Sequence, residues 1–460
     1  MSDRTCAELF PLPLTAFERY MLDDDRADYP MAFPTQFEFS GDIRRSALEA
    51  AIEETLPRHP LLCARVEYLK HRGPCFVHAA GQMPPLDWDV EGVPLRFPNG
   101  EAIDLTREVG LRFWVRKGDG TAVLTAQFHH ACCDGIGTMR FLGDLFAAYA
   151  MRTGAEGAGP IIKPLDVEQL RTRGEFHIEY PEPVSQTKAI WSTVCETAKW
   201  AVRRPTPLAV PTQLGNERTG EIGNGGYPGI EVHRFDMHQS RLLRQTATRL
   251  GATLNDLLLR DLFQTMWEWN EQYGPGRMGK WMQINMPQNL RTHARDGMPA
   301  ANKMSYVFLT RRTSGLRDAQ ALLDGIRWET KIIKDWSLGL YFIVGLSCVQ
   351  KVPGLYRWIA GRNRCFATTV LSNLGDLNRR LVVAFPRDGG RSVVGNLRLE
   401  NCRMVPPLRS MTHAALLATM YANCLHINVR CDPHRFPPGA SRELLSRYIQ
   451  KIEQTMGQTA

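Results

Sequence analysis

Several features that would fix a function class are missing from this 460-residue sequence. Its strongly apolar stretch, Trp336–Val349, is shorter than the roughly 20 residues that span a bilayer. The chain has no P-loop and no GxGxxG after a first strand, which argues against nucleotide hydrolysis and dinucleotide binding. The N-terminus lacks the charged-then-apolar pattern of a secretory signal, so we expect a cytoplasmic protein.

The cysteines and charges exclude further classes. Eleven cysteines, odd in number and without CxxC spacing, argue against a disulfide framework. Cys75 and His78 form one CxxH pair, but no second ligand pair follows nearby, and we expect no metal site. The net charge of +8 comes from dispersed Lys and Arg, so we expect no nucleic-acid partner. Some of these basic side chains could still bind the phosphates of coenzyme A or an acidic carrier protein.

The most informative feature that is present is the segment His129–Gly135, which reads HHACCDG. Two runs rich in β-forming residues, Leu111–Val115 and Thr121–His129, precede it and are separated by the hairpin turn signature Lys117–Gly120. Apolar residues at helical spacing follow over Met139–Tyr149. The motif is therefore predicted to lie where a strand ends and a helix begins, a common position for an active site.

The residue types in this motif point to acid–base chemistry. Imidazole exchanges a proton near neutral pH, and adjacent strand residues point to opposite faces. We therefore expect His130 to face a cleft as a catalytic base and His129 to pack internally. Asp134 is predicted to form a structural ion pair with an arginine. Cys132 and Cys133 are small residues that fit a tight loop, so a thiol nucleophile is disfavoured.

HHxxxDG resembles the superfamily of condensation domains, chloramphenicol acetyltransferase and wax ester/diacylglycerol acyltransferases. Six weaker segments resemble that superfamily in order and spacing: Pro13–Glu18, Phe39–Ile43, Arg58–Leu62, Ala252–Asp256, Pro287–Arg291 and Ser372–Gly375. Ile136-Gly137 replaces the Trp-Ser of peptide-forming condensation domains, Ala301-Asn302 replaces the Gly-Asn of the wax ester group, and no D-F-G-W-G segment is present. These departures favour a stand-alone O-acyltransferase, nearest to the wax ester synthase and alcohol acetyltransferase types.

The resemblance also implies a two-lobed fold. Strands interspersed with amphipathic helices in each half predict an α/β (α+β) sandwich. By resemblance, two similar lobes meet in a V around a central channel that is open at both ends. We expect an N-terminal lobe over residues 1–180, a helix and crossover linker over 181–226, and a C-terminal lobe over 227–460.

Periodicity predicts the following elements after the motif lobe: helices at Thr187–Arg203, Ser240–Leu250 and Leu254–Tyr273, and strands at Ile230–Phe235, Lys280–Met286, Ser305–Leu309, Ala367–Ser372, Arg391–Arg398 and Cys424–Arg430.

The activity implied is direct acyl transfer. His130 would take a proton from an acceptor hydroxyl while that oxygen attacks an acyl thioester. Asp134 and Arg291 would form the loop-fixing bridge of the resembling families. Candidate oxyanion donors are the backbone N–H of Gly135 and the side chain of Asn302 or Ser372, and Asn373 beside Ser372 is assigned to the substrate channel.

Three alternatives stay open. The donor is acyl-CoA or a phosphopantetheine-linked acyl group on a carrier protein, and no cofactor is expected to stay bound. The acceptor is an alcohol or, in a condensation-type enzyme, an amine. A non-catalytic binding homologue is the third class. Trp336–Val349 is a buried helix or an interfacial helix that contacts a membrane and admits a lipid chain.

Overall fold

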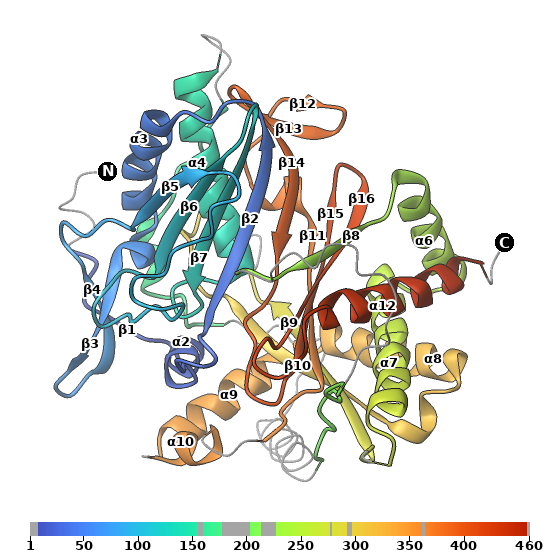
Figure 1. Cartoon of the computed structure of the whole chain (residues 1–460). Coiled ribbons are helices and arrows are strands. Elements are labelled where there is room, and N and C mark those ends of the chain that lie inside the picture. Colours follow the sequence, from blue (N-terminus) through green and yellow to red (C-terminus); the bar gives the residue numbers. More distant parts are fainter. Residues whose placement is uncertain are drawn as a thin grey trace.

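Two large β-sheets with helices packed on them form two lobes (Figure 1). The computed structural model describes residues 8–154, 160–176, 203–212, 227–276, 278–291, 297–352, 354–360 and 364–457. The predicted helix Thr187–Arg203 lies outside these residues, apart from Arg203.

The first lobe contains a seven-stranded sheet. Its strand order is β12 (Arg387–Asp388), β13 (Arg391–Val394), β14 (Leu397–Met404), β2 (Ala32–Ser40), β7 (Thr121–His129), β6 (Leu111–Lys117) and β5 (Leu86–Val90). A smaller sheet of β1 (Leu12–Pro13), β4 (Gly73–His78) and β3 (Ala64–Leu69) lies beside it. The helices of this lobe are α2 (Ala16–Asp23), α3 (Arg45–Thr55) and α4 (Gly135–Thr153).

The second lobe contains a six-stranded sheet. Its order is β10 (Met304–Arg312), β9 (Trp281–Asn289), β11 (Thr369–Asp376), β15 (Ala414–Tyr421), β16 (Cys424–Cys431) and β8 (Glu231–Arg234). Four helices pack against it: α6 (Met237–Arg249), α7 (Leu254–Tyr273), α8 (Ala319–Asp335) and α12 (Ala440–Gly457). Three shorter helices are α9 (Gly339–Gln350), α10 (Leu355–Ala360) and α11 (Leu377–Arg380).

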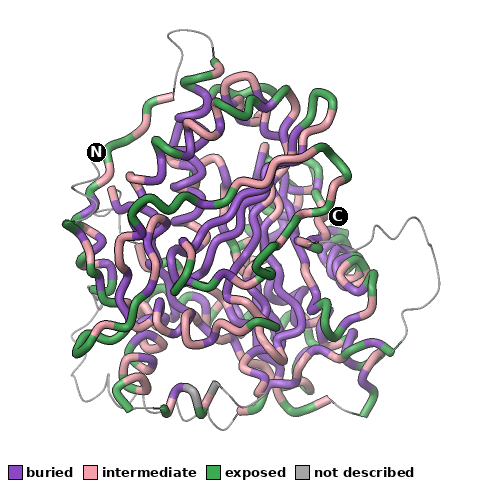
Figure 2. Tube along the Cα trace, turned by 60° about the vertical axis from the view of Figure 1, so that its left-hand side comes forward, coloured by how far each residue is buried: buried purple, intermediate pink, exposed green. Residues whose placement is uncertain are grey.

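Each lobe has its own hydrophobic core. In the first, Phe146 of α4 packs on Phe37 of β2, with ring centroids 5.2 Å apart. In the second, Trp269 of α7 is fully buried with the aliphatic residues of the sheet. Figure 2 shows that buried residues follow the strands of both sheets. Helix α4 is buried over most of its length, whereas helices such as α3 and α8 alternate between buried and exposed positions. This alternation is the expected pattern of amphipathic helices on a sheet.

The local predictions hold where turn chemistry and periodicity are strong. The predicted hairpin is confirmed, because β6 and β7 pair antiparallel and Gly118 N–H donates to the carbonyl of Thr121 at 3.0 Å. Helix α7 begins and ends at the predicted residues, Leu254 and Tyr273.

Two predictions about strands differ from the structure. The single strand predicted at Arg391–Arg398 is wrong, because β13 and β14 fold back at Gly395, which has a left-handed φ of +61°. β15 was not predicted, although it lies inside the second sheet between β11 and β16. Its residues form a continuous apolar run, buried on both faces, which has no period that distinguishes strand from helix.

The predicted division of the chain also needs correction. β12, β13 and β14 belong by sequence to the predicted C-terminal lobe of 227–460, yet they extend the first lobe's sheet, with Leu399 of β14 opposite Phe39 of β2. Leu208, within the predicted linker of 181–226, is buried in the second core. Sheet membership therefore follows long-range pairing and not chain order.

Candidate active site

The HHxxxDG motif occupies the junction between β7 and α4. β7 ends at His129 and α4 begins at Gly135. Asp134 caps the helix, because its Oδ1 accepts a hydrogen bond from the backbone N–H of Gly137 at 2.8 Å. The loop that carries His130 is therefore fixed at one end by a central strand and at the other by a capped helix.

His130 is enclosed by its surroundings, with only 6% of its surface exposed. Its backbone N–H donates to the carbonyl of Met31 at 2.7 Å. The ring lies edge-on to Phe33 and Phe17, with centroids 5.0 and 6.4 Å away. The imidazole therefore lies behind aromatic side chains, whereas the sequence predicted a ring that faces an open passage.

The electrostatics of His130 favour its neutral form. Burial lowers the pKa of His130 below its ordinary 6.5, and its own carbonyl, Asp134 and the Asn302 side chain partly counteract this effect. Its Nδ1 is buried and has no hydrogen-bond partner of good geometry. A neutral imidazole at pH 7 carries a lone pair and can accept a proton.

His129 packs internally, but His130 lies beyond the end of β7, so strand alternation does not set its direction. The His129 ring is fully buried, and its Nδ1 accepts a hydrogen bond from the backbone N–H of Ala131 at 3.0 Å. Its Nε2 lies 3.5 Å from Oδ2 of Asp25. These contacts tie β7 to the loop that precedes β2.

Asp134 and Arg291 form the predicted pair. Arg291 donates from Nη1 and Nη2 to the two carboxylate oxygens at 2.8 and 2.9 Å. The backbone N–H of Lys303 donates to the same carboxylate at 2.8 Å. Burial by itself would raise the pKa of Asp134, but Arg291 and the N–H groups of Lys303 and Gly137 hold it below 3.8. The buried carboxylate is therefore ionised and saturated with donors.

The segment that precedes β10 fastens the second half of the chain onto the motif. A β-carbon at Gly137 would lie 2.8 Å from the carbonyl oxygen of Ala301, so this close approach requires glycine. Arg140 of α4 donates to the carbonyl of Met298. Residues from both halves therefore build one site.

His59 is a buried neighbour of the motif that is not among the predicted site residues. Its Nδ1 accepts from the backbone N–H of Ala300 at 2.9 Å, and its Nε2 lies 3.3 Å from Oδ2 of Asp144 in α4. Arg58 donates to the same Asp144 oxygen at 2.9 Å. From the sequence, Arg58 and His59 are assigned only to a turn that resembles the superfamily. Two adjacent charged and polar side chains in a turn were the sequence signal that could have identified these contacts.

Asn302 has a different position from the one predicted for an oxyanion donor. Its Nδ2 donates to the carbonyls of His130 and Ala131, both at 2.8 Å. Both amide hydrogens are thereby committed, so the assignment of Asn302 as an oxyanion donor is wrong. Its Oδ1 is buried without a partner. This oxygen is an acceptor, and it can only serve a donor such as an imidazole N–H.

The remaining predicted site residues lie on β11 and at the start of α4. A β-carbon at Gly135 would lie 3.1 Å from Cδ2 of Leu374, so β11 passes close to the motif. Ser372 is half-buried on that strand. Asn373 is exposed and donates to Oδ1 of Asn255 at 3.2 Å.

The two motif cysteines are buried between the strand end and the helix. Burial raises the pKa of Cys133 to about 12. Burial also raises the pKa of Cys132 well above its ordinary value. Both thiols stay protonated at neutral pH, which disfavours a role as nucleophile.

A cavity of about 280 Å³ lies next to this site, between α2, β10, α8, α9 and α10. Its lining is mainly aromatic and aliphatic and includes Tyr20, Tyr306, Phe308, Tyr341, Phe342 and Leu346. His130 does not line it. Phe17 of α2 lies between the two, because its ring centroid is 5.3 Å from that of Tyr306 and 6.4 Å from that of His130.

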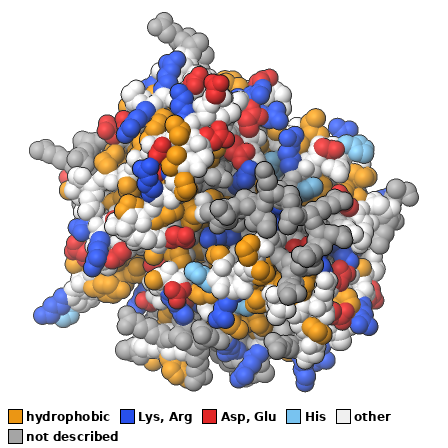
Figure 3. Space-filling view, viewed as in Figure 1, with side chains coloured by type: hydrophobic (Ala, Val, Ile, Leu, Met, Phe, Trp, Pro, Cys, Tyr) orange, Lys and Arg blue, Asp and Glu red, His pale blue; other side chains and the backbone are white. Residues whose placement is uncertain are grey.

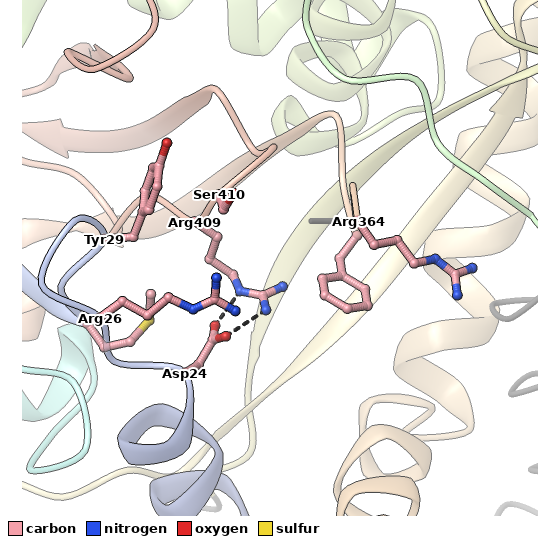
Figure 4. A pocket seen from close by; sticks show the side chains of 8 residues that line it. Asp24, Arg26, Tyr29, Arg364, Arg409 and Ser410 are labelled. Atoms are coloured by element: carbon pink, nitrogen blue, oxygen red, sulfur yellow. Dashed lines mark hydrogen bonds and ion pairs between the residues drawn. The ribbon is translucent and has the colours of Figure 1, made fainter. Parts of the chain in front are cut away.

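A small recess adjoins this cavity and shares Arg409 and Phe366 with it (Figure 4). Asp24 faces Arg409 there, and its Oδ1 accepts from Nη2 of Arg409 at 2.7 Å. The guanidinium also lies over the Phe366 ring at 4.4 Å. Arg409 is therefore neutralised by a carboxylate at this end of the cavity.

No group of three or more His, Cys, Asp or Glu side chains in the described ranges is arranged to hold a metal ion. Within those same ranges, no single helix is long and apolar enough to cross a membrane, whereas α8 and α9, bent by 66°, pass the test as a pair.

Comparison with known sequences finds distant similarity. No family model matches the chain. The chain is 26% identical over 347 residues to the uncharacterized protein Rv2305 of Mycobacterium tuberculosis, which covers 70% of this chain and 72% of that protein.

Comparison with solved structures decides the fold. The first condensation domain of the calcium-dependent antibiotic synthetase superposes on 97% of this chain and 96% of that domain, at TM-score 0.66 and 14% identity. The chain has the two-lobed condensation-domain fold.

Other proteins share the condensation-domain fold with this chain. The starter condensation domain of rhizomide synthetase RzmA, solved with C8-CoA and Leu-SNAC, covers 97% of it at TM-score 0.61 and 11% identity, over 94% of that chain. Polyketide synthase associated protein 5 from Mycobacterium tuberculosis covers 98% of it at TM-score 0.57 and 16% identity, over 99% of that chain. The chain spans 45% of the length of the nonribosomal peptide synthetase FmoA3, at TM-score 0.65 and 14% identity.

Proposed function

We propose that this protein transfers an acyl group from a thioester to a hydroxyl group, with His130 as the general base. The observation that carries this proposal is a buried imidazole, whose pKa is lowered by burial, on a loop fixed by the pair of Asp134 and Arg291. The complete HHxxxDG sequence favours a catalyst over a non-catalytic homologue.

The proposed reaction is a direct transfer. The His130 imidazole takes the proton of the acceptor hydroxyl as its oxygen bonds to the thioester carbonyl carbon. The tetrahedral intermediate collapses, the carbon–sulfur bond breaks, and the imidazolium returns the proton to the thiolate. The backbone N–H of Gly135 and the hydroxyl of Ser372 remain the proposed donors to the oxyanion.

We further propose that Asn302 is a positioning residue for the base. Its Oδ1 and the Nδ1 of His130 are both buried without a hydrogen-bond partner of good geometry. The amide oxygen is an acceptor, and Nδ1 is a donor when it carries the ring proton. A hydrogen bond from Nδ1–H to this oxygen would place the ring proton on Nδ1. The lone pair would then lie on Nε2, facing the substrates.

We propose acyl-CoA as the donor and an alcohol as the acceptor. The net charge of +8 suits the phosphates of CoA, and the RzmA domain of the same fold was solved with C8-CoA. Lys and Arg are interspersed with Asp and Glu on the face shown in Figure 3, which does not favour nucleic acid. Ile136-Gly137 after the motif favours an alcohol over the amine of peptide synthesis.

We also propose that α9 and α10 contact a membrane surface. Val344, Val352 and Trp358 are 45%, 52% and 57% exposed along this part of the chain. Lys334 and Lys351 are exposed at either side of α9, where they can meet anionic headgroups.

All nine cysteines within the described residues are free, which supports a reducing compartment such as the cytoplasm.

A donor and acceptor panel tests the proposed reaction. Free thiol release is followed for acyl-CoA and acyl-carrier donors with alcohol and amine acceptors. We expect release with acyl-CoA and an alcohol, and we expect a folded His130→Ala variant to lose at least about 100-fold in turnover. Near-normal turnover of that variant contradicts the role of His130. His238→Ala, an exposed histidine on α6, is the matched control.

A further inference from the structure

The wall that α9 gives to the 280 Å³ cavity is a continuous apolar stripe. Tyr341, Phe342, Gly345, Leu346 and Val349 line the cavity at helical spacing. A ligand that fills this space therefore meets hydrocarbon and ring edges along the whole of one helix.

The opposite wall comes from elements close to His130. Tyr306 and Phe308 of β10 and Tyr20 of α2 face the cavity, and the Tyr20 and Tyr306 rings contact each other edge-on at 6.1 Å. Burial raises the pKa of Tyr20 far above its ordinary value, so the Tyr20 hydroxyl stays neutral. The Tyr20, Tyr306 and Phe308 side chains of this wall therefore carry no charge at neutral pH.

The charge at one end of the cavity is already neutralised. Arg409 is bound to Asp24 and stacked on Phe366, so it is not available for an anionic head group. The two other charged side chains of the lining also have partners, since Arg203 lies over the Trp281 ring and Glu329 pairs with Arg311.

The helix is apolar on its outer side as well. Val344 of α9 is exposed and does not line the cavity, and exposed Lys351 follows the helix. A single helix thus separates the cavity from an apolar, lysine-flanked surface, a pattern typical of segments that lie at a lipid surface. This favours a ligand that partitions into lipid.

We propose that this cavity binds the aliphatic chain of a lipid substrate, and that Phe17 is the partition between the chain and His130. The proposal rests on the proposed acyl transfer, and it names the substrate class. The chain belongs to the donor or to the acceptor, and in either case its reactive end reaches the imidazole once the Phe17 ring turns aside.

Gly345 allows the cavity to be filled without disturbing its walls. A β-carbon at Gly345 meets no heavy atom within 4 Å, and the residue lines the cavity. Gly345→Phe therefore places a ring in the open space. Gly315→Phe is the matched control, because Gly315 is exposed in the second lobe and a β-carbon there also meets nothing within 4 Å.

The first measurement is binding of cis-parinaric acid to the full chain in solution, followed by its own fluorescence. We expect Gly345→Phe to weaken binding by about tenfold or more, because the ring displaces the chain from the apolar space. Gly315→Phe and the wild type should bind equally. Equal binding by Gly345→Phe, or no binding by the wild type, overturns the proposal.

The second measurement assigns the chain to one substrate. Dodecanoyl-CoA is compared with acetyl-CoA as donor to ethanol, and dodecanol with ethanol as acceptor from acetyl-CoA. Gly345→Phe should raise KM for the long-chain member of one pair and leave the short-chain reaction unchanged. A uniform loss for short and long chains contradicts the cavity assignment.

The failures of the two proposals are distinguishable. If the wild type releases no thiol from any donor but Gly345→Phe weakens its binding of cis-parinaric acid, the proposed chain site stands and the proposed acyl transfer is wrong. If the wild type releases thiol and Gly345→Phe binds cis-parinaric acid as well as the wild type does, the proposed chain site is wrong and the proposed acyl transfer stands.

Discussion

Arg291 holds both oxygens of Asp134, at 2.8 and 2.9 Å, although the two residues are 157 positions apart in the sequence. The pair joins the start of α4 in the first lobe to the end of β9 in the second. It fixes the loop that carries His130 from the side opposite the strand.

Arg291→Ala should destabilise the protein by about 3–5 kcal/mol, because it leaves the carboxylate of Asp134 buried without its counter-ion. Urea unfolding measures the loss. Arg379→Ala is the control, since the Arg379 side chain is 88% exposed. A loss below about 1 kcal/mol for Arg291→Ala contradicts the structural role of the pair.

The same pair predicts a pH dependence of stability. The pKa of Asp134 in the folded protein lies below 3.8, so its contribution is present above about pH 3.8 and is lost as the pH falls through the lower folded value. The difference in Tm between wild type and Arg291→Ala should therefore narrow toward low pH. A difference that widens on acidification is the contrary result.

The acid limb of the rate profile should report His130. Since burial lowers its pKa below 6.5, kcat/KM should fall on acidification with a midpoint below pH 6.5. Below pH 6.5 the unfolded chain takes up this proton before the folded chain does, so folding stability also decreases as the pH falls. A midpoint at or above pH 6.5 contradicts the neutral, buried base.

Asn302→Ala tests the positioning role of that side chain. Because the Asn302 side chain raises the pKa of His130, its removal should move the acid limb to lower pH and reduce kcat by about tenfold. A residue that only supports the fold would lower the Tm and leave the limb in place. Asn302→Asp keeps an acceptor oxygen and should retain the position of the limb better than alanine does.

Liposome sedimentation tests the membrane contact. Val344→Asp with Trp358→Asp should reduce binding to vesicles of phosphatidylcholine and phosphatidylserine, since both side chains are exposed in α9 and α10. Ile161→Asp in the first lobe, 85% exposed, is the control. Equal sedimentation of all three proteins removes the proposed contact. Leu340 and Ile343 are buried and unsuited to this test, because an aspartate there would disrupt packing.

The features of the fold that depend only on neighbouring residues could be predicted from the sequence. The hairpin of β6 and β7, the limits of α7 and the strand-to-helix position of His130 follow from turn residues and period, which act over a few positions.

Tertiary structure alone decided which distant segments meet. The placement of β12–β14 in the first sheet, the contact of His59 with Asp144 and the donor bonds of Asn302 join residues that are far apart in the chain. The enclosure of His130 by Phe17 and Phe33 is of the same kind. Such contacts depend on how two cores pack against each other, and local patterns of hydrophobicity and turn residues carry no record of that packing.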